Sequence, residues 1–232
     1  DIWGFSVPRM LDSVDDRLEA GDDRKIQPLQ AAGLEVVSTG LLLDDEDTAL
    51  MWRGLMLSKA LEQFLTDVSW SPDLGYLVID MPPGTGDVQM ALSRMLPQAE
   101  MVVVTTPQRA AQKVAARVAD MARRSHMPVV GVVENMSGFT TEDGRHYELF
   151  GSGGGMELAE QLGVPLLGQV PLDPGVVNGG DEGRPVVTAD PDGPAGASIR
   201  SVASRLLELV PPAAEDSCTA RIAVLEEQLA AM

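Results

Sequence analysis

Three short runs of aliphatic and β-branched residues constrain the fold of this chain more than any other feature of its sequence. They span residues 75–80, 101–106 and 128–135, and residues 34–38 and 166–170 repeat the pattern more weakly. Continuous apolar runs of this length are typical of strands that are buried on both faces of a parallel sheet. The sequence therefore predicts a sheet built mainly from these segments.

Helical periodicity fills the intervals between the runs. Apolar residues recur at helical spacing from Leu57 to Val68 and again from Ala111 to Met121. Strands that alternate with helices predict an α/β fold, with a mostly parallel sheet and helices on both of its faces. Ligands of such folds bind beyond the carboxyl ends of the strands, so polar residues that end a strand are the first candidates for a site.

The C-terminal part of the chain has a different composition. Residues 173–197 are rich in Pro, Gly and Asp and predict an irregular loop, followed by a helix over residues 197–209 that a Pro-Pro pair ends. Residues 215–232 have the pattern of a short amphipathic helix. We therefore expect one domain over residues 1–210 and a helical tail over residues 211–232.

Charge and cysteine content narrow the classes of function. The chain has 17 basic and 35 acidic residues, and its formal net charge of −18 repels nucleic-acid phosphates and anionic lipid headgroups. We therefore expect no nucleic-acid partner, and no apolar stretch is long enough to predict a membrane span. The single cysteine, Cys218, excludes a disulfide within these 232 residues. A cytoplasmic protein fits these features best.

The most specific signal is the stretch of residues 76–87. An apolar run ends in Asp80, and a Met-Pro-Pro-Gly-Thr-Gly-Asp loop follows it. A carboxylate at the end of a strand can hold Mg²⁺ through a water ligand. The loop combines the fixed φ angles of proline with the freedom of glycine, as a loop that senses a γ-phosphate requires. The alternative is an ordinary strand-to-helix turn in which Asp87 caps the helix.

Five motifs occur in an order that resembles the Mrp (ApbC) proteins, which are relatives of the MinD/ParA ATPases. The motifs lie at residues 53–61, 80–87, 104–108, 133–137 and 150–155. The resemblance covers nearly the whole chain to about residue 185. It implies a P-loop NTPase fold of the SIMIBI, MinD-like class, and an iron–sulfur cluster carrier that binds and hydrolyses ATP with Mg²⁺ as a homodimer.

The resemblance also implies that the domain is incomplete at its N-terminal side. Residues 1–8 are similar to the end of a family motif that follows the second strand, so we expect the first two strands and the lysine-bearing phosphate loop upstream of residue 1. No Gly-Lys-Ser/Thr string occurs in the 232 residues, and a phosphate cradle needs such a glycine-rich turn. We therefore expect the full-length protein to be an ATPase and this chain alone to be inactive.

The resemblance assigns four residues to the phosphate and metal side of the site. Asp1 falls in the first switch, near the attacking water and the γ-phosphate, and Asp80 is the catalytic carboxylate that binds Mg²⁺. Gly84 and Gly86 match the second switch, whose backbone approaches the phosphate closely. For the two glycines the alternative is an ordinary turn.

Two further residues belong to the base side of the expected site. Asn135 matches the position whose amide reads the adenine edge, and an amide suits that edge because it donates and accepts at once. A cap or turn asparagine is the alternative. Pro171 matches the loop that closes over the base. The three glycines at residues 153–155 predict either an anion-binding nest or a flexible helix start.

The cysteine pair of cluster-carrying relatives is missing. Those relatives have Cys-x-x-Cys after the position of Phe139, and two pairs across a dimer would bind a [4Fe–4S] cluster through four thiolates. Here residues 140–144 read Thr-Thr-Glu-Asp-Gly and contain no sulfur ligand. Cys218 lies in a polar segment much further along the chain, and we interpret it as an incidental cysteine.

Two functions fit these motifs. The first is an ATP-dependent carrier or assembly factor that delivers iron–sulfur clusters to apoprotein partners. The second is a nucleotide-gated dimer switch of the MinD/ParA type that binds a protein partner and holds no cluster. The ATP and Mg²⁺ motifs support both, and the missing cysteine pair favours the second mechanism. We take the carrier as the function because the resemblance covers most of the chain.

Overall fold

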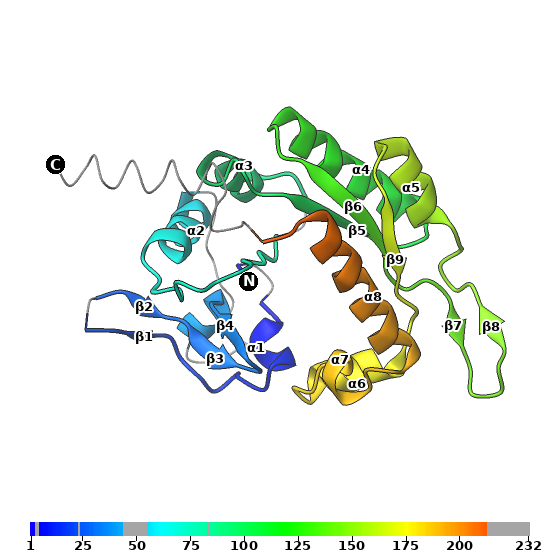
Figure 1. Cartoon of the computed structure of the whole chain (residues 1–232), viewed down its shortest axis with the longest axis horizontal. Helices are drawn as coiled ribbons and strands as arrows, with labels where there is room; N and C mark the ends of the chain where they lie inside the picture. The colour runs from blue at the N-terminus through cyan, green and yellow to red at the C-terminus, as the bar shows by residue number, and fades with distance from the viewer. Residues whose placement is uncertain (3–4, 23, 44–54, 83, 213–232) are drawn as a thin grey trace.

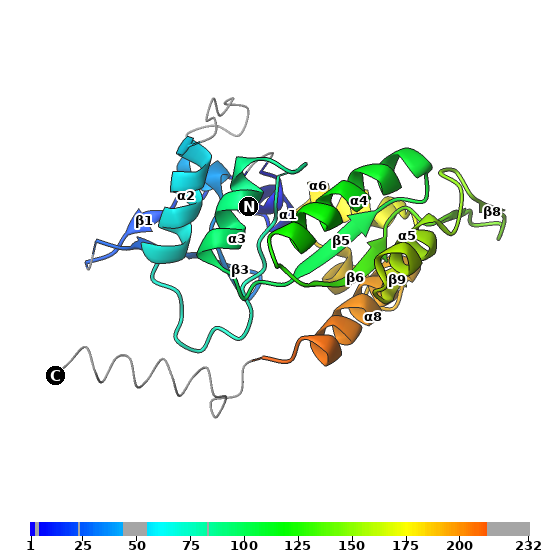
Figure 2. The same ribbon diagram turned by 90° about the horizontal axis from the view of Figure 1, so that it is seen from above.

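The computed structural model describes residues 1–2, 5–22, 24–43, 55–82 and 84–212. Its elements form two groups that lie at opposite ends of the molecule, and a hairpin extends beyond the second group (Figure 1 and Figure 2). The first group contains short antiparallel hairpins and two longer helices. The second contains a parallel sheet with its covering helices.

A parallel sheet of three strands forms the centre of the second group. β5 (Met101–Thr105) pairs with β6 (Val129–Glu134), and β6 pairs with β9 (Leu166–Gln169). The runs at residues 101–106, 128–135 and 166–170 are therefore confirmed as strands of a parallel sheet.

Helices cover both faces of this sheet, as the sequence predicted (Figure 1). On one face, the small side chains of Ala115 and Ala119 let α4 (Arg109–Arg124) pack closely on Val103 and Val132, beside α5 (Gly154–Leu162). On the other face lies α8 (Pro194–Leu209). Its apolar side chains pack against a cluster of sheet residues formed by Val133, Leu167 and Val170.

The run at residues 75–80 is not a strand, so this part of the prediction is wrong. It has no regular secondary structure and pairs with no strand among the described residues, and Val78 is 88% exposed. A strand forms only where a neighbouring strand satisfies its backbone groups. β5 also pairs on one side only within the described residues, and Val104 on it is 61% exposed.

The run at residues 34–38 forms a hairpin instead of joining the parallel sheet. β4 (Leu34–Val36) pairs antiparallel with β3 (Leu29–Ala31). The turn between them places Ala32 and Gly33 at φ 49° and 77°, as a two-residue hairpin turn requires. A second small hairpin joins β1 (Glu19–Ala20) to β2 (Ile26–Gln27). Two short helices complete this region, α1 (Val7–Met10) and the 3₁₀ helix η1 (Thr39–Leu42).

The two longer helices of the first group pack against the second group. α2 (Leu55–Thr66) confirms the helix predicted around residues 57–68, and α3 (Asp87–Met95) follows the glycine loop. Both contribute to one apolar cluster that reaches the end of α4. Its buried members are Ile2, Leu61, Val88, Leu92, Ala122 and Met127.

The irregular loop predicted over residues 173–197 is wrong. The segment contains α6 (Pro174–Asp181), α7 (Val186–Ala189) and the first turn of α8. Asp173 caps α6, because its carboxylate accepts a hydrogen bond of 2.7 Å from the Gly175 N–H. Prolines occupy the first turns of α6 and α8, where a missing N–H costs nothing. The helix predicted over residues 197–209 is confirmed and begins three residues earlier.

The remaining elements are β7 (Phe139–Thr140) and β8 (His146–Tyr147), which form the hairpin that extends from the molecule (Figure 2). The helix predicted over residues 215–232 lies outside the described residues, so the boundary between the expected domain and its tail stays a prediction. In the described part of the chain, no helix combines the length and the apolar character that a membrane crossing requires.

Candidate functional site

The carboxyl ends of the three parallel strands bring Asn135 and Pro171 together. Asn135 directly follows β6, and Pro171 comes two residues after β9. Backbone hydrogen bonds join the loops: the Ser137 N–H donates to the Val170 carbonyl (2.9 Å), and the Asn135 N–H donates to the Thr105 carbonyl at the end of β5 (2.8 Å). The two residues predicted to contact the base therefore lie on adjoining loops at the edge where such folds bind ligands.

The side chain of Asn135 is held by its own loop. Its Oδ1 accepts a hydrogen bond of 2.9 Å from the Met136 N–H, and within the described residues nothing accepts from its NH₂ group. Met136 has φ 56°, in the left-handed region that residues other than glycine rarely adopt. Unusual backbone conformations of this kind concentrate at functional sites. The amide keeps its two donors and one lone pair for a ligand.

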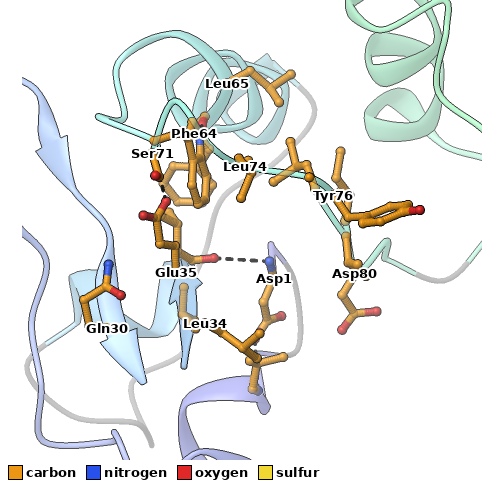
Figure 3. Close-up of a pocket in the computed structure, with 18 of the residues that line it drawn as sticks. Asp1, Gln30, Leu34, Glu35, Phe64, Leu65, Ser71, Leu74, Tyr76 and Asp80 are labelled. Carbon is orange, nitrogen blue, oxygen red and sulfur yellow. Dashed lines mark hydrogen bonds between the residues drawn. The ribbon is translucent and has the colours of Figure 1, made fainter. Parts of the chain in front are cut away.

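A pocket of about 600 Å³ lies between the β3–β4 hairpin, α2 and residues 70–80 (Figure 3). Its wall is largely apolar, with Leu34 and Phe64 on opposite sides. Asp1 and Asp80 both line it. The structure therefore brings together the two carboxylates that were predicted for catalysis and metal binding. The four other predicted residues are not part of its lining, namely Gly84, Gly86, Asn135 and Pro171.

Asp1 is held by hydrogen bonds of its side chain and of its backbone. Its carboxylate accepts from the Val7 N–H (3.1 Å) and the Ser38 hydroxyl (3.2 Å). Its backbone nitrogen donates to the Val37 carbonyl (3.3 Å), and its carbonyl accepts from the Thr39 N–H (3.1 Å).

Asp80 is exposed, and no hydrogen bond from the described residues reaches its carboxylate. The described residues contain no group of three or more His, Cys, Asp or Glu side chains that could hold a metal ion. Mg²⁺ does not need such a group, because it commonly binds one or two protein carboxylates together with water and substrate phosphates. The chemistry of Asp80 therefore fits the predicted role of holding Mg²⁺ through a water ligand, and that role stays a prediction.

The glycine loop is braced by a residue that the sequence analysis missed. Gly84 has φ 97° in open space, as a tight turn requires, and Gly86 is the N-cap of α3. Gln89, which is 3% exposed, accepts from the Gly86 N–H (2.9 Å) and donates to the Pro82 carbonyl (2.7 Å). The alternative with Asp87 as the cap is wrong, because the helix already begins there. A glutamine three residues after a helix cap was the available signal.

The segment in which the family resemblance leads one to expect a cysteine pair forms the β7–β8 hairpin. Its polar side chains bind one another: the Thr141 hydroxyl donates to the Arg145 carbonyl (3.1 Å), and Arg145 pairs with Asp143 (3.1 Å). These are oxygen and nitrogen groups, whereas iron–sulfur clusters are held by thiolates. Cys218 lies outside the described residues. The donor set of this hairpin does not fit an iron–sulfur cluster.

A parallel sheet with helices on both faces, and polar loops at the carboxyl ends of its strands, is typical of α/β nucleotide-binding folds, to which the P-loop NTPases belong. A family model described as ParA, NUBPL iron-transfer P-loop NTPase, matches residues 1–207. The chain belongs to this family.

Known proteins with similar sequences and structures agree with this assignment. The chain is 45% identical over 212 residues to the iron-sulfur cluster carrier protein of Mycobacterium tuberculosis, covering 89% of this chain and 55% of the relative. It thus spans about half the length of the curated relatives it matches. A nucleotide-binding protein in complex with ADP from Archaeoglobus fulgidus superimposes with a TM-score of 0.66 at 26% identity, covering 84% of this chain and 74% of that one. The cell division ATPase MinD of Pyrococcus furiosus shares the fold, with a TM-score of 0.50 at 21% identity over 66% of this chain and 58% of that one.

Proposed function

We propose that this chain is the nucleotide-binding part of an ATP-dependent iron–sulfur cluster carrier. The observation that carries the proposal is the position of Asn135, whose amide stands beside the Pro171 loop at the carboxyl ends of the sheet with two donors available. Such an amide can pair with the donor and acceptor on the adenine edge. The 45% identity to a protein named as a cluster carrier supports the cluster as cargo.

The other predicted residues would bind Mg²⁺, orient the attacking water and approach the γ-phosphate of ATP. Asp80 would hold Mg²⁺ through a water ligand, and Asp1 would orient the attacking water near the γ-phosphate. Gly84 and Gly86 would bring their loop close to that phosphate. A phosphate cradle is not encoded in these 232 residues, which contain no Gly-Lys-Ser/Thr string. We therefore assign ATP hydrolysis to a homodimer, by family resemblance, in which a phosphate loop from outside these 232 residues completes each site.

One observation favours the second function, a nucleotide-gated switch that binds a protein partner and carries no cluster. The β7–β8 hairpin offers oxygen and nitrogen groups where a carrier needs thiolates. Two copies of Cys218 would supply two of the four thiolates that a [4Fe–4S] cluster takes. A switch needs only a nucleotide site and a surface that changes with its occupancy.

Anaerobic reconstitution with iron and sulfide separates the two functions. A carrier gives a coloured protein with charge-transfer absorbance after gel filtration, and Cys218→Ser lowers that absorbance if the thiol is a ligand. A matched control, Ser204→Ala, changes an exposed hydroxyl on α8 and should leave the spectrum unaltered. A colourless wild-type product contradicts the carrier and leaves the switch as the function.

A further inference from the structure

Glu134 is a buried carboxylate at the end of β6, directly before Asn135, and it is 0% exposed. Its Oε1 accepts hydrogen bonds from the Ser137 hydroxyl (2.7 Å) and from the Gln169 amide (2.7 Å). Its Oε2 accepts from the Gly155 N–H. Of the described basic residues, none forms an ion pair with it. A buried charge of this kind is tolerated only while its hydrogen-bond donors stay in place.

The three donors come from three different parts of the fold. Ser137 belongs to the loop that carries Asn135, Gln169 is the last residue of β9, and Gly155 lies in the first turn of α5. The amino end of a helix carries a partial positive charge, which adds to the attraction of the carboxylate. The carboxylate of Glu134 thus connects the Asn135 loop, β9 and α5 by hydrogen bonds.

The glycines at residues 153–155 serve this arrangement. A Cβ atom at Gly155 would lie 2.5 Å from the Cβ of Glu134, and one at Gly154 would lie 2.2 Å from the Pro107 carbonyl oxygen. Both positions therefore require glycine for α5 to begin so close to β6. The sequence left open an anion-binding nest at these residues, and the anion at the start of α5 is the protein's own carboxylate.

The loop that presents Asn135 is consequently fixed at both ends. At its start, the Asn135 N–H is bonded to the Thr105 carbonyl. At its end, Ser137 donates from its hydroxyl to Glu134 and from its backbone to Val170. Only Met136 lies between these anchors. The direction of the Asn135 amide is therefore set by a loop that the Glu134 carboxylate holds down.

We propose that Glu134 is a positioning residue for base recognition, which acts through Asn135 by holding the loop of residues 135–137 against β9 and the start of α5. This inference rests on the proposed reading of adenine by Asn135. Glu134 itself is fully buried against its three donors, so contact with the base is left to Asn135.

A swap of two side chains tests this arrangement. In Glu134→Gln, the new amide oxygen can accept from the Gly155 N–H, and the NH₂ group then faces Ser137 and Gln169, so the Gln169 amide must turn over to present its oxygen and the charge-assisted hydrogen bonds are lost. In Gln169→Glu, two carboxylates face each other. In the double variant, the amide introduced at position 134 can accept from Gly155 and donate to the carboxylate introduced at position 169. That new carboxylate can also accept from the Ser137 hydroxyl. The double variant therefore regains a charge-assisted hydrogen bond between positions 134 and 169, and it gives Gly155 and Ser137 an acceptor each.

The matched control is Glu157→Gln. It removes the same charge from the first turn of the same helix, at an exposed side chain with no hydrogen bond to the described residues. Gln169→Ala is a milder variant at an exposed position, which removes one donor and leaves the buried carboxylate in place. It keeps the test open if Glu134→Gln does not fold.

Two measurements are made on the whole chain. Amide hydrogen exchange follows residues 135–138 and 153–156 without any nucleotide. Competition against a fluorescent ATP analogue gives the preference for ATP over GTP with Mg²⁺. For Glu134→Gln we expect exchange about tenfold faster in both segments and an ATP preference about tenfold lower, because the charge-assisted hydrogen bonds are lost. The double variant should return both values to within about threefold of the wild type, and Glu157→Gln should change neither.

Three results would overturn the proposal. These are unchanged exchange at residues 135–138 in both Glu134→Gln and Gln169→Ala, a double variant no better than either single one, or faster exchange with an unaltered ATP preference. The last result would make Glu134 a purely structural residue. A wild-type chain that binds ATP and GTP equally would instead refute base reading by Asn135, and the exchange data would still decide whether Glu134 holds the loop.

Discussion

Replacement of Gly154 by alanine tests how tightly α5 is seated on the ends of the strands. The added Cβ would lie 2.2 Å from the Pro107 carbonyl oxygen, about 1.2 Å short of the 3.4 Å at which ordinary contact begins. The neighbour is a backbone atom that follows β5, so it cannot turn aside as a side chain would. The start of α5 must then move away from both Pro107 and Glu134.

The change in unfolding free energy is the sum of two opposing contributions. Forcing an extra methyl group into a packed interior costs about 1–3 kcal/mol, and the contact here calls for the upper part of that range. Alanine has a higher helix propensity than glycine, so the replacement also stabilises the helix by up to about 1 kcal/mol. We expect a net loss of about 1–2 kcal/mol of unfolding free energy, or roughly 2–8 °C in Tm for a chain of this size.

Urea unfolding and thermal melting, both followed by circular dichroism, measure this effect. Gly180→Ala is the matched control, because Gly180 also lies in a helix and its added Cβ would only touch the Met10 side chain at an ordinary 3.8 Å. That variant should be as stable as the wild type or up to about 1 kcal/mol more stable. If Gly154→Ala melts at or above the wild-type temperature, the close seating of α5 described above is incorrect.

Three further predictions concern the nucleotide. Asp80→Asn should weaken the Mg²⁺-dependent part of ATP binding, whereas Asp73→Asn, which changes another exposed carboxylate of the same pocket, should leave it intact. Titration of ATP with and without Mg²⁺ measures this, and an unchanged Mg²⁺ dependence in Asp80→Asn would remove Asp80 from the metal site. Asn135→Ala should reduce the preference for ATP over GTP by about 1–3 kcal/mol, because the base edge loses its partner; an identical preference in competition assays would mean that the base is read elsewhere. The chain should dimerise weakly, and equally with and without ATP and Mg²⁺, since it lacks a phosphate loop and its charge of −18 opposes association. An ATP-dependent dimer in sedimentation experiments would contradict this last prediction.

The apolar runs located all three described strands of the parallel sheet, because burial on both faces leaves a mark in the sequence itself. Pairing leaves no such mark. Residues 75–80 have the same pattern as residues 101–106, yet only the second run finds a neighbouring strand among the described residues. Residues 34–38 found their partner in the preceding five residues through a local turn, which removed them from the parallel sheet.

Proline and glycine gave an ambiguous signal over residues 173–197. Both residues are common in loops, but proline is also common in the first turn of a helix and glycine can precede that turn. Asp173 followed by Pro174 is a cap and a first helical residue, a combination that favours α6 over the irregular loop that composition suggested. The short length of α6 and α7 hid them further, because a helix of four to eight residues has little room for periodicity.

The base side of the candidate site was accessible from the sequence because Asn135 and Pro171 each follow a recognisable strand. Glu134 was not, although it stands next to Asn135. Its role depends on Gln169, which is 35 positions away, and on Gly155, which is 21 positions away. Such contacts exist only once the strands have paired and α5 has docked, and no local pattern encodes them.

One side of β5 pairs with no strand that the structure describes, and this has a consequence for the behaviour of these 232 residues in solution. Met101–Thr105 contains neither a charged side chain nor a proline, the features that usually prevent a strand edge from adding another strand. Short apolar edges of this type are templates for cross-β aggregation. Mutual repulsion between copies of charge −18 opposes that addition, but salt shortens its range to about 8 Å at 0.15 M. The chain should therefore keep its colloidal stability in dilute buffer and lose it steadily as the ionic strength rises, so its storage conditions depend on one strand edge.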